Sequence, residues 1–253
     1  MNDTIEIILF IIGLFNILFL GFGTFFFAQR GGVSYLSGRL SLLQSYKSKK
    51  MAMYDNPFYR DKTSHFETLP KSEAEIIFLG DSLTDLCEWA EVLRNDGIKN
   101  RGICGDTTDG ILNRITNIVE SKPQKLFVMI GINDLNQGKK VEDILENYKK
   151  ILETFQNQIP DTKIFIQSLL PVNQKIFKNK GVNEKVMTLN DQLKDLAKTF
   201  SFQYIDLFSS FLDGNNELDA QYTTDGLHLN GQGYLIWKGI IEKQVNDSAS
   251  VRS

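Results

Sequence analysis

From residue 75 onward the sequence alternates between short apolar runs and longer amphipathic segments, and this alternation constrains the fold more than any other feature. The apolar runs are continuous and rich in Ile, Phe and Val, which is typical of strands covered on both faces of a sheet. We expect strands at 75–80, 98–103, 125–131, 163–170 and 202–208. Helical patterns occupy 84–94, 108–121, 141–158, 182–200 and 231–245. Strands that alternate with helices favour right-handed βαβ units, so the sequence predicts an α/β domain with a parallel sheet.

Polar segments stand at the ends of these expected strands or just beyond the last one. They are GDSLT at 80–84, RGICGDTTDG at 101–110, GINDL at 131–135 and DGLHLN at 225–230. In open α/β sheets, ligands bind outside the carboxyl ends of the strands. The four segments are therefore the candidate site.

Ser82 follows the first expected strand at a turn into a helix, where a hydroxyl group is exposed. A serine needs an adjacent base before it can act as a nucleophile. The alternative is that Asp81 or Ser82 only caps the next helix.

His228 is one of only two histidines in the chain, and it follows Asp225 by three positions. One short turn would let the Asp225 carboxylate hold Nδ1–H of the ring, which leaves Nε2 free to accept a serine proton. The other histidine, His65, lies outside every strand end, and we expect a surface or packing role for it.

Gly105 and Asn133 are candidate hydrogen-bond donors at the ends of the second and third strands. A glycine permits close approach of the backbone to a ligand, and a side-chain amide can donate to a developing oxyanion. The alternatives are an ordinary glycine-containing loop and ordinary turn chemistry, and we assign Asp134 mainly to the turn. A phosphate-binding loop is disfavoured because the GxxxxGK[ST] pattern is missing.

Together the four segments resemble, in the same order, the four sequence blocks of the SGNH (GDSL) hydrolase family, and within it the platelet-activating-factor acetylhydrolase-like bacterial esterases. The resemblance covers about residues 70–245. It implies a flavodoxin-like three-layer α/β/α sandwich with a five-stranded parallel sheet in the order 2-1-3-4-5. It also implies ester hydrolysis without a metal or another cofactor. By the same resemblance, Ser82 is the nucleophile of a triad with Asp225 and His228, and an oxyanion hole comprises Ser82, Gly105 and Asn133.

An uncharged apolar segment, IILFIIGLFNILFLGFGTFFFA, occupies residues 7–28. At 1.5 Å per residue, a helix of this length matches a hydrocarbon core of roughly 30 Å. The leader MNDTIE carries no Lys or Arg, and no A-x-A cleavage pattern follows, so a removable signal peptide fits poorly. The sequence therefore predicts one N-terminal transmembrane helix within residues 1–30, which would anchor the chain in the cell membrane.

The segment between this helix and the α/β domain is predicted to hold a juxtamembrane helix and a connector, over residues 31–70. Apolar residues recur at helical spacing from Val33 to Tyr46, which fits either a helix on the membrane surface or one packed on the following domain. Residues 51–74 have mixed polarity and are expected to connect to a hydrolase domain over residues 71–253. Basic residues follow the span but do not precede it, which favours the cytoplasmic side for that domain.

The net charge and the Cys and His content limit which partners and metal ions the chain could bind. A net charge of −3 gives no electrostatic argument for a nucleic-acid partner. Cys87 and Cys104 are isolated, so the sequence supports neither a disulfide framework nor a zinc site, although a single bridge between them stays open. A metal centre built from Asp134, Asp225 and His228 would have too few nitrogen ligands.

The resemblance suggests a short acyl group, such as acetyl, on a lipid or a carbohydrate. The alternatives are acyl transfer to a carbohydrate, a long-chain lysophospholipase or thioesterase, and a non-catalytic membrane-tethered scaffold. The substrate pocket is expected at loops near 84–89, 106–108, 134–139 and 171–181. The last of these carries three lysines, which could meet an anionic substrate but are also typical of a solvated loop.

Overall fold

The computed structural model of the chain describes residues 56–71, 76–179 and 181–247. The chain divides into two compact units, Met1–Asn56 and Pro57–Ser253, and the fold below is that of the second unit. The membrane span expected at 7–28 and the helical pattern expected at 33–46 lie outside the described residues. Within the described ranges, none of the helices combines the length and the hydropathy that crossing a membrane requires.

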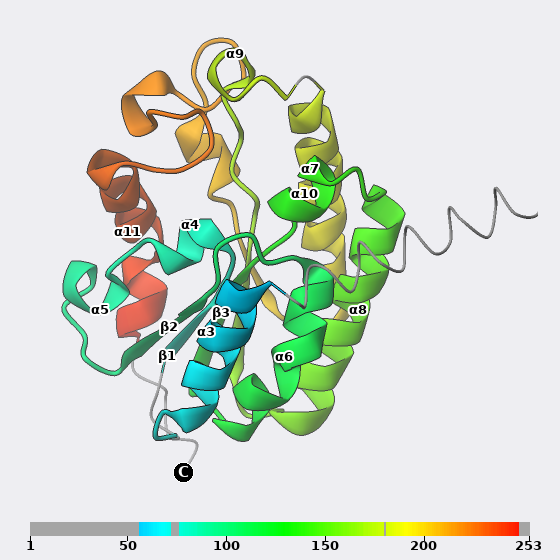
Figure 1. Cartoon of the computed structure of the whole chain (residues 1–253), viewed down its shortest axis with the longest axis vertical. Helices are drawn as coiled ribbons and strands as arrows, with labels where there is room; N and C mark the ends of the chain where they lie inside the picture. The colour runs from blue at the N-terminus through cyan, green and yellow to red at the C-terminus, as the bar shows by residue number, and fades with distance from the viewer. Residues whose placement is uncertain (1–55, 72–75, 180, 248–253) are drawn as a thin grey trace, which may run out of the picture. The chain divides into compact units, whose positions relative to one another are not determined.

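Five parallel strands form the centre of the second unit (Figure 1). They are β1 (Ile76–Gly80), β2 (Ile98–Gly102), β3 (Lys125–Met129), β4 (Lys163–Gln167) and β5 (Gln203–Ile205). Their order across the sheet is β2-β1-β3-β4-β5, which confirms the predicted α/β class and strand order. β1 lies between β2 and β3, and its Ile77 is in register with Lys99 and Leu126. The carboxyl ends of β1, β2 and β3 therefore meet at one edge of the sheet.

The longer helices cover both faces of the sheet and give the three predicted layers (Figure 1). They are α6 (Thr108–Glu120), α8 (Val141–Gln158), α10 (Val182–Thr199) and α11 (Gly231–Asn246). Side chains alternate along β1, because Ile77 and Leu79 join the core under α6, α8 and α10, whereas Ile76 and Phe78 join the core under α11. Two separate hydrophobic cores thus pack against the two faces of one sheet.

Aromatic side chains stack on one another in the core under α11. Phe78 and Phe127 stack with centroids 4.8 Å apart, and Phe127 stacks on Phe165 at 4.5 Å. Trp89 lies on Phe78 at 4.3 Å and contacts Trp237 of α11 edge to face. Such pairs add to the stabilisation from burial of their apolar area, so this face is a firm support for the helix that follows DGLHLN.

The segment expected to be a connector at 51–74 contains a helix, α3 (Pro57–Thr68). Pro57 is the first residue of this helix, a position to which proline is well suited because its missing N–H has no intrahelical acceptor there. α3 buries Tyr59 and Phe66, and the Tyr59 hydroxyl donates to Gly110 O of α6 at 2.8 Å. The helix therefore belongs to the same compact unit as the sheet.

Two further regions differ from the expected pattern. The helix expected at 84–94 is two short ones, α4 (Ser82–Asp85) and α5 (Trp89–Val92). The Asn100 side chain donates to the last two carbonyls of α4 and to Cys87 O beyond them, which ends α4. The loop at 171–181 contains a short helix, α9 (Gln174–Phe177), which the Asn173 side chain caps. Short helices of this kind carry little periodicity and depend on tertiary contacts, so sequence pattern does not find them.

Candidate active site

Ser82 is the first residue of α4, immediately beyond the carboxyl end of β1. The Asp81 side chain accepts a hydrogen bond from Leu83 N at 3.0 Å and caps the helix. The Ser82 hydroxyl is therefore not needed as the cap. Its Oγ lies 2.9 Å from Nε2 of His228, so a base stands within hydrogen-bonding distance of it.

His228 is in turn held by Asp225. Nδ1 of its ring lies 2.6 Å from Asp225 Oδ2, and the other carboxylate oxygen accepts the backbone amides of Leu227 and His228. Partial burial raises the pKa of Asp225, but the hydrogen bonds from the His228 ring and from the two amides outweigh it and lower the pKa to about 2. The carboxylate is thus ionised at neutral pH and fixes Nδ1 as the protonated ring nitrogen.

The exposure of Asp225 and His228 indicates that this pair contributes little to stability. The Asp225 side chain is 52% exposed and that of His228 34%, and exposed ion pairs contribute little to stability. The turn that carries them is nevertheless narrowly specified. Gly226 has φ +83°, and a Cβ there would lie 2.8 Å from Asn173 O, so only glycine lets the turn pack against the loop before α9. An exposed polar pair on a tightly specified turn is typical of a functional site.

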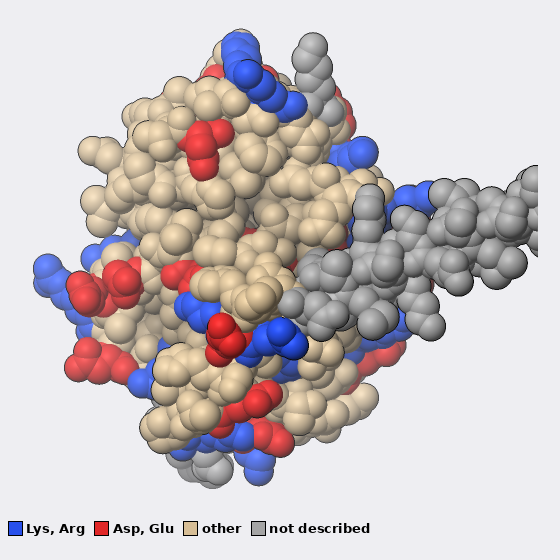
Figure 2. All heavy atoms as spheres, viewed as in Figure 1, with Lys and Arg blue, Asp and Glu red and all other residues tan. Residues whose placement is uncertain are grey.

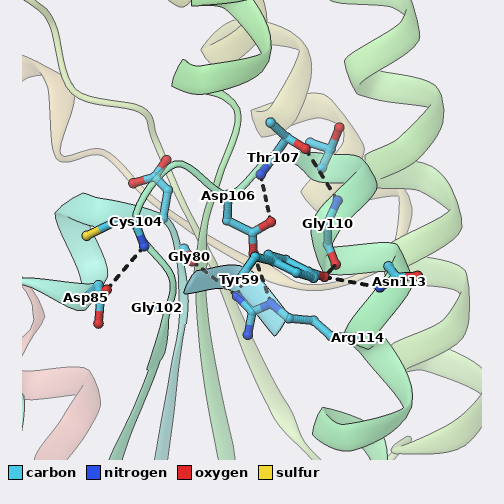
Figure 3. A network of polar contacts seen from close by, with 12 residues as sticks. Tyr59, Gly80, Asp85, Gly102, Cys104, Asp106, Thr107, Gly110, Asn113 and Arg114 are labelled. Carbon is cyan, nitrogen blue, oxygen red and sulfur yellow. Dashed lines mark hydrogen bonds and ion pairs between the residues drawn. The ribbon is translucent and has the colours of Figure 1, made fainter. Parts of the chain in front are cut away.

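Gly105 lies in a turn that follows β2 (Figure 3 shows its neighbours). Asp106 N donates to Ile103 O at 3.0 Å, and Gly105 occupies the third position of this turn with φ +80°, as in a type II turn. The amides on both sides are engaged, since Cys104 N donates to Asp85 Oδ2 at 3.1 Å. Among the described residues, Gly105 N–H has no hydrogen-bond partner, and the residue is exposed.

Asp106 anchors the far side of the same turn. Its carboxylate is buried and pairs with the buried guanidinium of Arg114 at 2.8 Å, and Arg114 also donates to Gly80 O at the end of β1 (Figure 3). Burial raises the pKa of Asp106, and the guanidinium opposes this shift. Gly110 leaves room for the carboxylate, because a Cβ there would lie 1.7 Å from Oδ1 of Asp106. This ion pair ties the ends of β1 and β2 together.

Asn133 belongs to α7 (Ile132–Asn136), which follows β3. Its Nδ2 donates to Asp106 O at 2.9 Å. A side-chain amide carries two N–H groups, so the second is left for another acceptor. The structure thus joins Asn133 to the Gly105 turn, and it joins Ser82 to His228 and Asp225, all at the carboxyl edge of the sheet.

Asp134 differs from the expectation of a turn residue. It is 1% exposed, and its carboxylate accepts from Thr108 N, from Thr108 Oγ1 and from Lys139 Nζ, each within 3.0 Å. A buried carboxylate requires such donors. Asp134 therefore fastens α7 to the start of α6, which fixes the helix that carries Asn133.

Sequence reasoning passed over Arg114 and Asp85. Arg114 had a detectable signal, because it stands between Ile111 and Ile118 on the apolar face of α6, where a charged residue requires a buried partner. Asp85 had none, since its partners come from segments far away in the sequence.

Other residues considered from the sequence take no part in the hydrogen bond of Ser82 Oγ. His65 is exposed on α3, in keeping with a surface role. Cys87 and Cys104 are both free thiols, so no bridge joins them. In the described part of the chain, His, Cys, Asp and Glu side chains form no group of three that could hold a metal ion.

The lysine-containing loop at 171–181 borders a hollow lined by Gln174, Lys175, Lys178 and Glu217. Lys175 and Lys178 are exposed, and basic side chains gather over α9 in Figure 2. Glu217 adds an acidic group to the same hollow. The mixture of charges is what a solvated loop displays and is no purely basic anion site.

Comparison with known proteins places this geometry in context. The profile of the GDSL-like Lipase/Acylhydrolase family matches residues 78–236, more than half of the chain. The platelet-activating factor acetylhydrolase IB subunit alpha2 of Gallus gallus is 30% identical over 169 residues, which are 64% of this chain and 72% of that protein.

Solved structures share the fold. A GDSL-like lipase from Bacteroides thetaiotaomicron is similar with a TM-score of 0.67 at 22% identity, over 76% of this chain and 98% of that one. An acetylxylan esterase from Geobacillus stearothermophilus is similar with a TM-score of 0.58 at 15% identity, over 70% and 96%. At these identities the likeness is one of architecture.

Proposed function

The chain belongs to the GDSL-like lipase/acylhydrolase family and is a hydrolase, and from this premise we propose that it is a membrane-anchored serine esterase that removes short acyl groups. The observation that carries the proposal is the continuous line of hydrogen bonds from Ser82 Oγ to His228 Nε2 and from His228 Nδ1 to Asp225. It supplies a nucleophile, a base and an orienting carboxylate, which is the minimum set for acyl transfer through serine.

In the proposed cycle, Nε2 of His228 accepts the Ser82 proton while Oγ attacks the ester carbonyl. Asp225 stabilises the imidazolium that forms. The tetrahedral intermediate collapses, the C–O bond to the alcohol breaks, and the imidazolium returns its proton to the leaving oxygen. Water then attacks the acyl-serine with His228 again as base, which releases the acid and restores the Ser82 hydroxyl.

The oxyanion hole is proposed to consist of the N–H groups of Ser82 and Gly105 and the side-chain amide of Asn133. Ser82 is the first residue of α4, where N–H groups have no acceptor within the helix. The hydrogen bonds of Cys104 N and Asp106 N hold the turn that carries Gly105 N–H. The bond to Asp106 O holds the Asn133 amide, which leaves its second N–H as a donor. Loss of one such donor typically lowers kcat by about 10²–10³.

Acetyl is the acyl group we favour, carried by a lipid or a carbohydrate. Its support is the acetylhydrolase named among the relatives. The acylhydrolase family supports hydrolysis over the scaffold reading, because a scaffold would not require the Ser82, His228 and Asp225 set. Acyl transfer to a sugar and hydrolysis of long acyl chains use the same serine chemistry, so they are separated by products and not by the triad.

The test is a series of p-nitrophenyl esters graded by acyl length, assayed with the purified full chain and with Ser82→Ala. We expect the highest kcat/KM for the acetyl ester and activity near background for the variant. A fluorophosphonate probe should label the wild-type chain and not Ser82→Ala. Preference for long acyl esters would overturn the acetyl proposal, and transfer of acetyl to an added sugar at the expense of free acetate would indicate an acyltransferase.

Membrane anchoring is proposed from the apolar segment at 7–28, with the hydrolase domain on the cytoplasmic side. We expect the full chain to stay in the membrane pellet after extraction with alkaline carbonate. Protease added to intact cells should leave residues 30–70 uncut. Extraction by carbonate would contradict the span, and cleavage in intact cells would place the domain on the outer side.

A further inference from the structure

Lys62 lies in the middle of α3, outside the strand ends that supply the proposed catalytic groups. Its Nζ stands 5.9 and 5.7 Å from the ring centroids of Phe58 and Phe66, so the ammonium group is bordered by aromatic rings on its own helix. Nζ donates to Asp85 Oδ1 at 2.8 Å. The Lys62 side chain is 32% exposed and that of Asp85 only 10%.

Asp85 connects this lysine to the Gly105 turn. While Oδ1 accepts from Lys62, Oδ2 accepts the backbone N–H of Cys104 at 3.1 Å (Figure 3 shows the second contact). The carboxylate thus bridges α3 and the residue that precedes Gly105. Gly102 permits the arrangement, because a Cβ there would lie 2.3 Å from Asp85 N and would push α4 away from β2.

We propose that Lys62 is a positioning residue for the Gly105 amide, an inference that rests on the oxyanion hole proposed above. In a type II turn the central peptide, here Cys104–Gly105, has an alternative flipped form in which its N–H points the opposite way. The Asp85 carboxylate holds Cys104 N, and Lys62 holds the carboxylate. Without the lysine, a mostly buried carboxylate lacks its counter-charge, and its rotation towards water releases the turn.

The same segment offers a matched control. Lys71 follows α3 and pairs with Glu120 of α6, and both side chains are well exposed, at 40% and 53%. Glu120 accepts no hydrogen bond from the Gly105 turn. Exposed pairs of this kind contribute little, so Lys71→Gln removes an equal charge from the same region without touching the turn.

The experiment compares Lys62→Gln, Lys62→Arg and Lys71→Gln in the full chain, with p-nitrophenyl acetate as substrate. We expect Lys62→Gln to lower kcat by about 10- to 50-fold with KM within about twofold, since a displaced donor is a partial loss of the oxyanion hole. Lys62→Arg keeps the charge and should restore most of kcat. Lys71→Gln should behave as wild type.

A double-mutant cycle then tests whether Lys62 acts through Asp85 or independently of it. If Lys62 acts through Asp85, adding Lys62→Gln to Asp85→Asn lowers kcat no further, whereas multiplied losses would overturn the inference. An unchanged kcat in Lys62→Gln, or an equal loss in Lys71→Gln, would overturn it as well. Activity that survives Ser82→Ala would instead refute the proposed function, so the two failures are distinguishable.

Discussion

Asp81 is a buried carboxyl group directly beside Ser82, and its ionisation is costly. It is 1% exposed. Burial, together with the charges of Asp106 and Asp134, outweighs the hydrogen bond from Leu83 N and raises its pKa from an ordinary value near 4 to about 7. Between these two pH values the folded chain binds a proton that the unfolded chain releases. The contribution of Asp81 to stability therefore falls as pH rises from about 4 to about 7.

Asp81→Asn should remove this pH dependence while keeping a side-chain oxygen that caps α4. We expect the variant to gain stability relative to wild type at pH 8 but not at pH 4. The gain is at most about 4 kcal/mol, since one pKa unit corresponds to about 1.36 kcal/mol. Urea unfolding at both pH values measures it. The same difference between variant and wild type at pH 4 and pH 8 would show that Asp81 does not titrate in this range.

Asp225→Asn tests the orienting role at the other end of the hydrogen-bonded line. The amide lacks the charge that stabilises the imidazolium and favours the wrong ring tautomer, so kcat should fall by about 10²–10⁴. Because both side chains are partly exposed, the midpoint of thermal unfolding should move little. A kcat within threefold of wild type would remove Asp225 from the proposed triad.

At this scale, the residues found from the sequence share one property. Ser82, Gly105, Asn133 and His228 each stand in a short motif at a strand end or just beyond the sheet, where position alone indicates chemistry. Lys62 and its partner Asp85 could not be found in this way. Their meaning comes from segments that meet only in three dimensions.

Individual elements are tied together by close backbone approaches. The contact of β2 with α4 at Gly102 sets the position of Ser82 relative to the Gly105 turn. Gly102→Ala should therefore destabilise the fold by about 1–3 kcal/mol and lower kcat, because the added methyl group meets backbone that cannot move independently. Urea unfolding and ester hydrolysis measure the two effects.

Gly239→Ala is the matched control. Gly239 lies within α11, and nothing stands within 4 Å of a Cβ built there. Replacing a glycine in the interior of a helix by alanine should stabilise the protein by about 0.5–1 kcal/mol. If both alanine variants had the same unfolding free energy, the close approach at Gly102 would not be the cause.

The long elements were predictable because each has many periodic positions. The helix expected at 141–158 matches α8 in the structure, and β1 to β4 begin within one residue of the expected strands. α3 and α4 were not predictable, because α3 depends on burial of Tyr59 and Phe66, and α4 ends where the Asn100 side chain binds its carbonyls. In these cases tertiary contacts decide the boundary.

For the molecule as a whole, the proposed chemistry needs no ion, because His228 activates Ser82 and N–H groups hold the oxyanion. We expect dialysis against EDTA to leave ester hydrolysis within 10–20% of the untreated rate, roughly the error of such assays. A loss of activity that added divalent metal restores would instead favour the metal-dependent reading through Asp134, Asp225 and His228.

The α/β class and the strand order were predictable at this scale, since alternating strands and helices leave few topologies and the resemblance selects one of them. The membrane span at 7–28 stays a prediction. It lies outside the described residues and rests on the length and hydropathy of the segment alone.

Ser82 and His228 form their hydrogen bond across 146 positions of sequence. β1 and β2 are close in sequence and can pair early in refolding, whereas we expect the turn that carries His228 to dock only after β4 and β5 have added to the sheet. Contacts of long sequence separation form slowly, because the chain entropy of a large loop must be lost first. Recovery of hydrolysis after dilution from urea should therefore lag behind the return of the far-ultraviolet circular dichroism signal. The rate at which activity returns then measures the last step of folding.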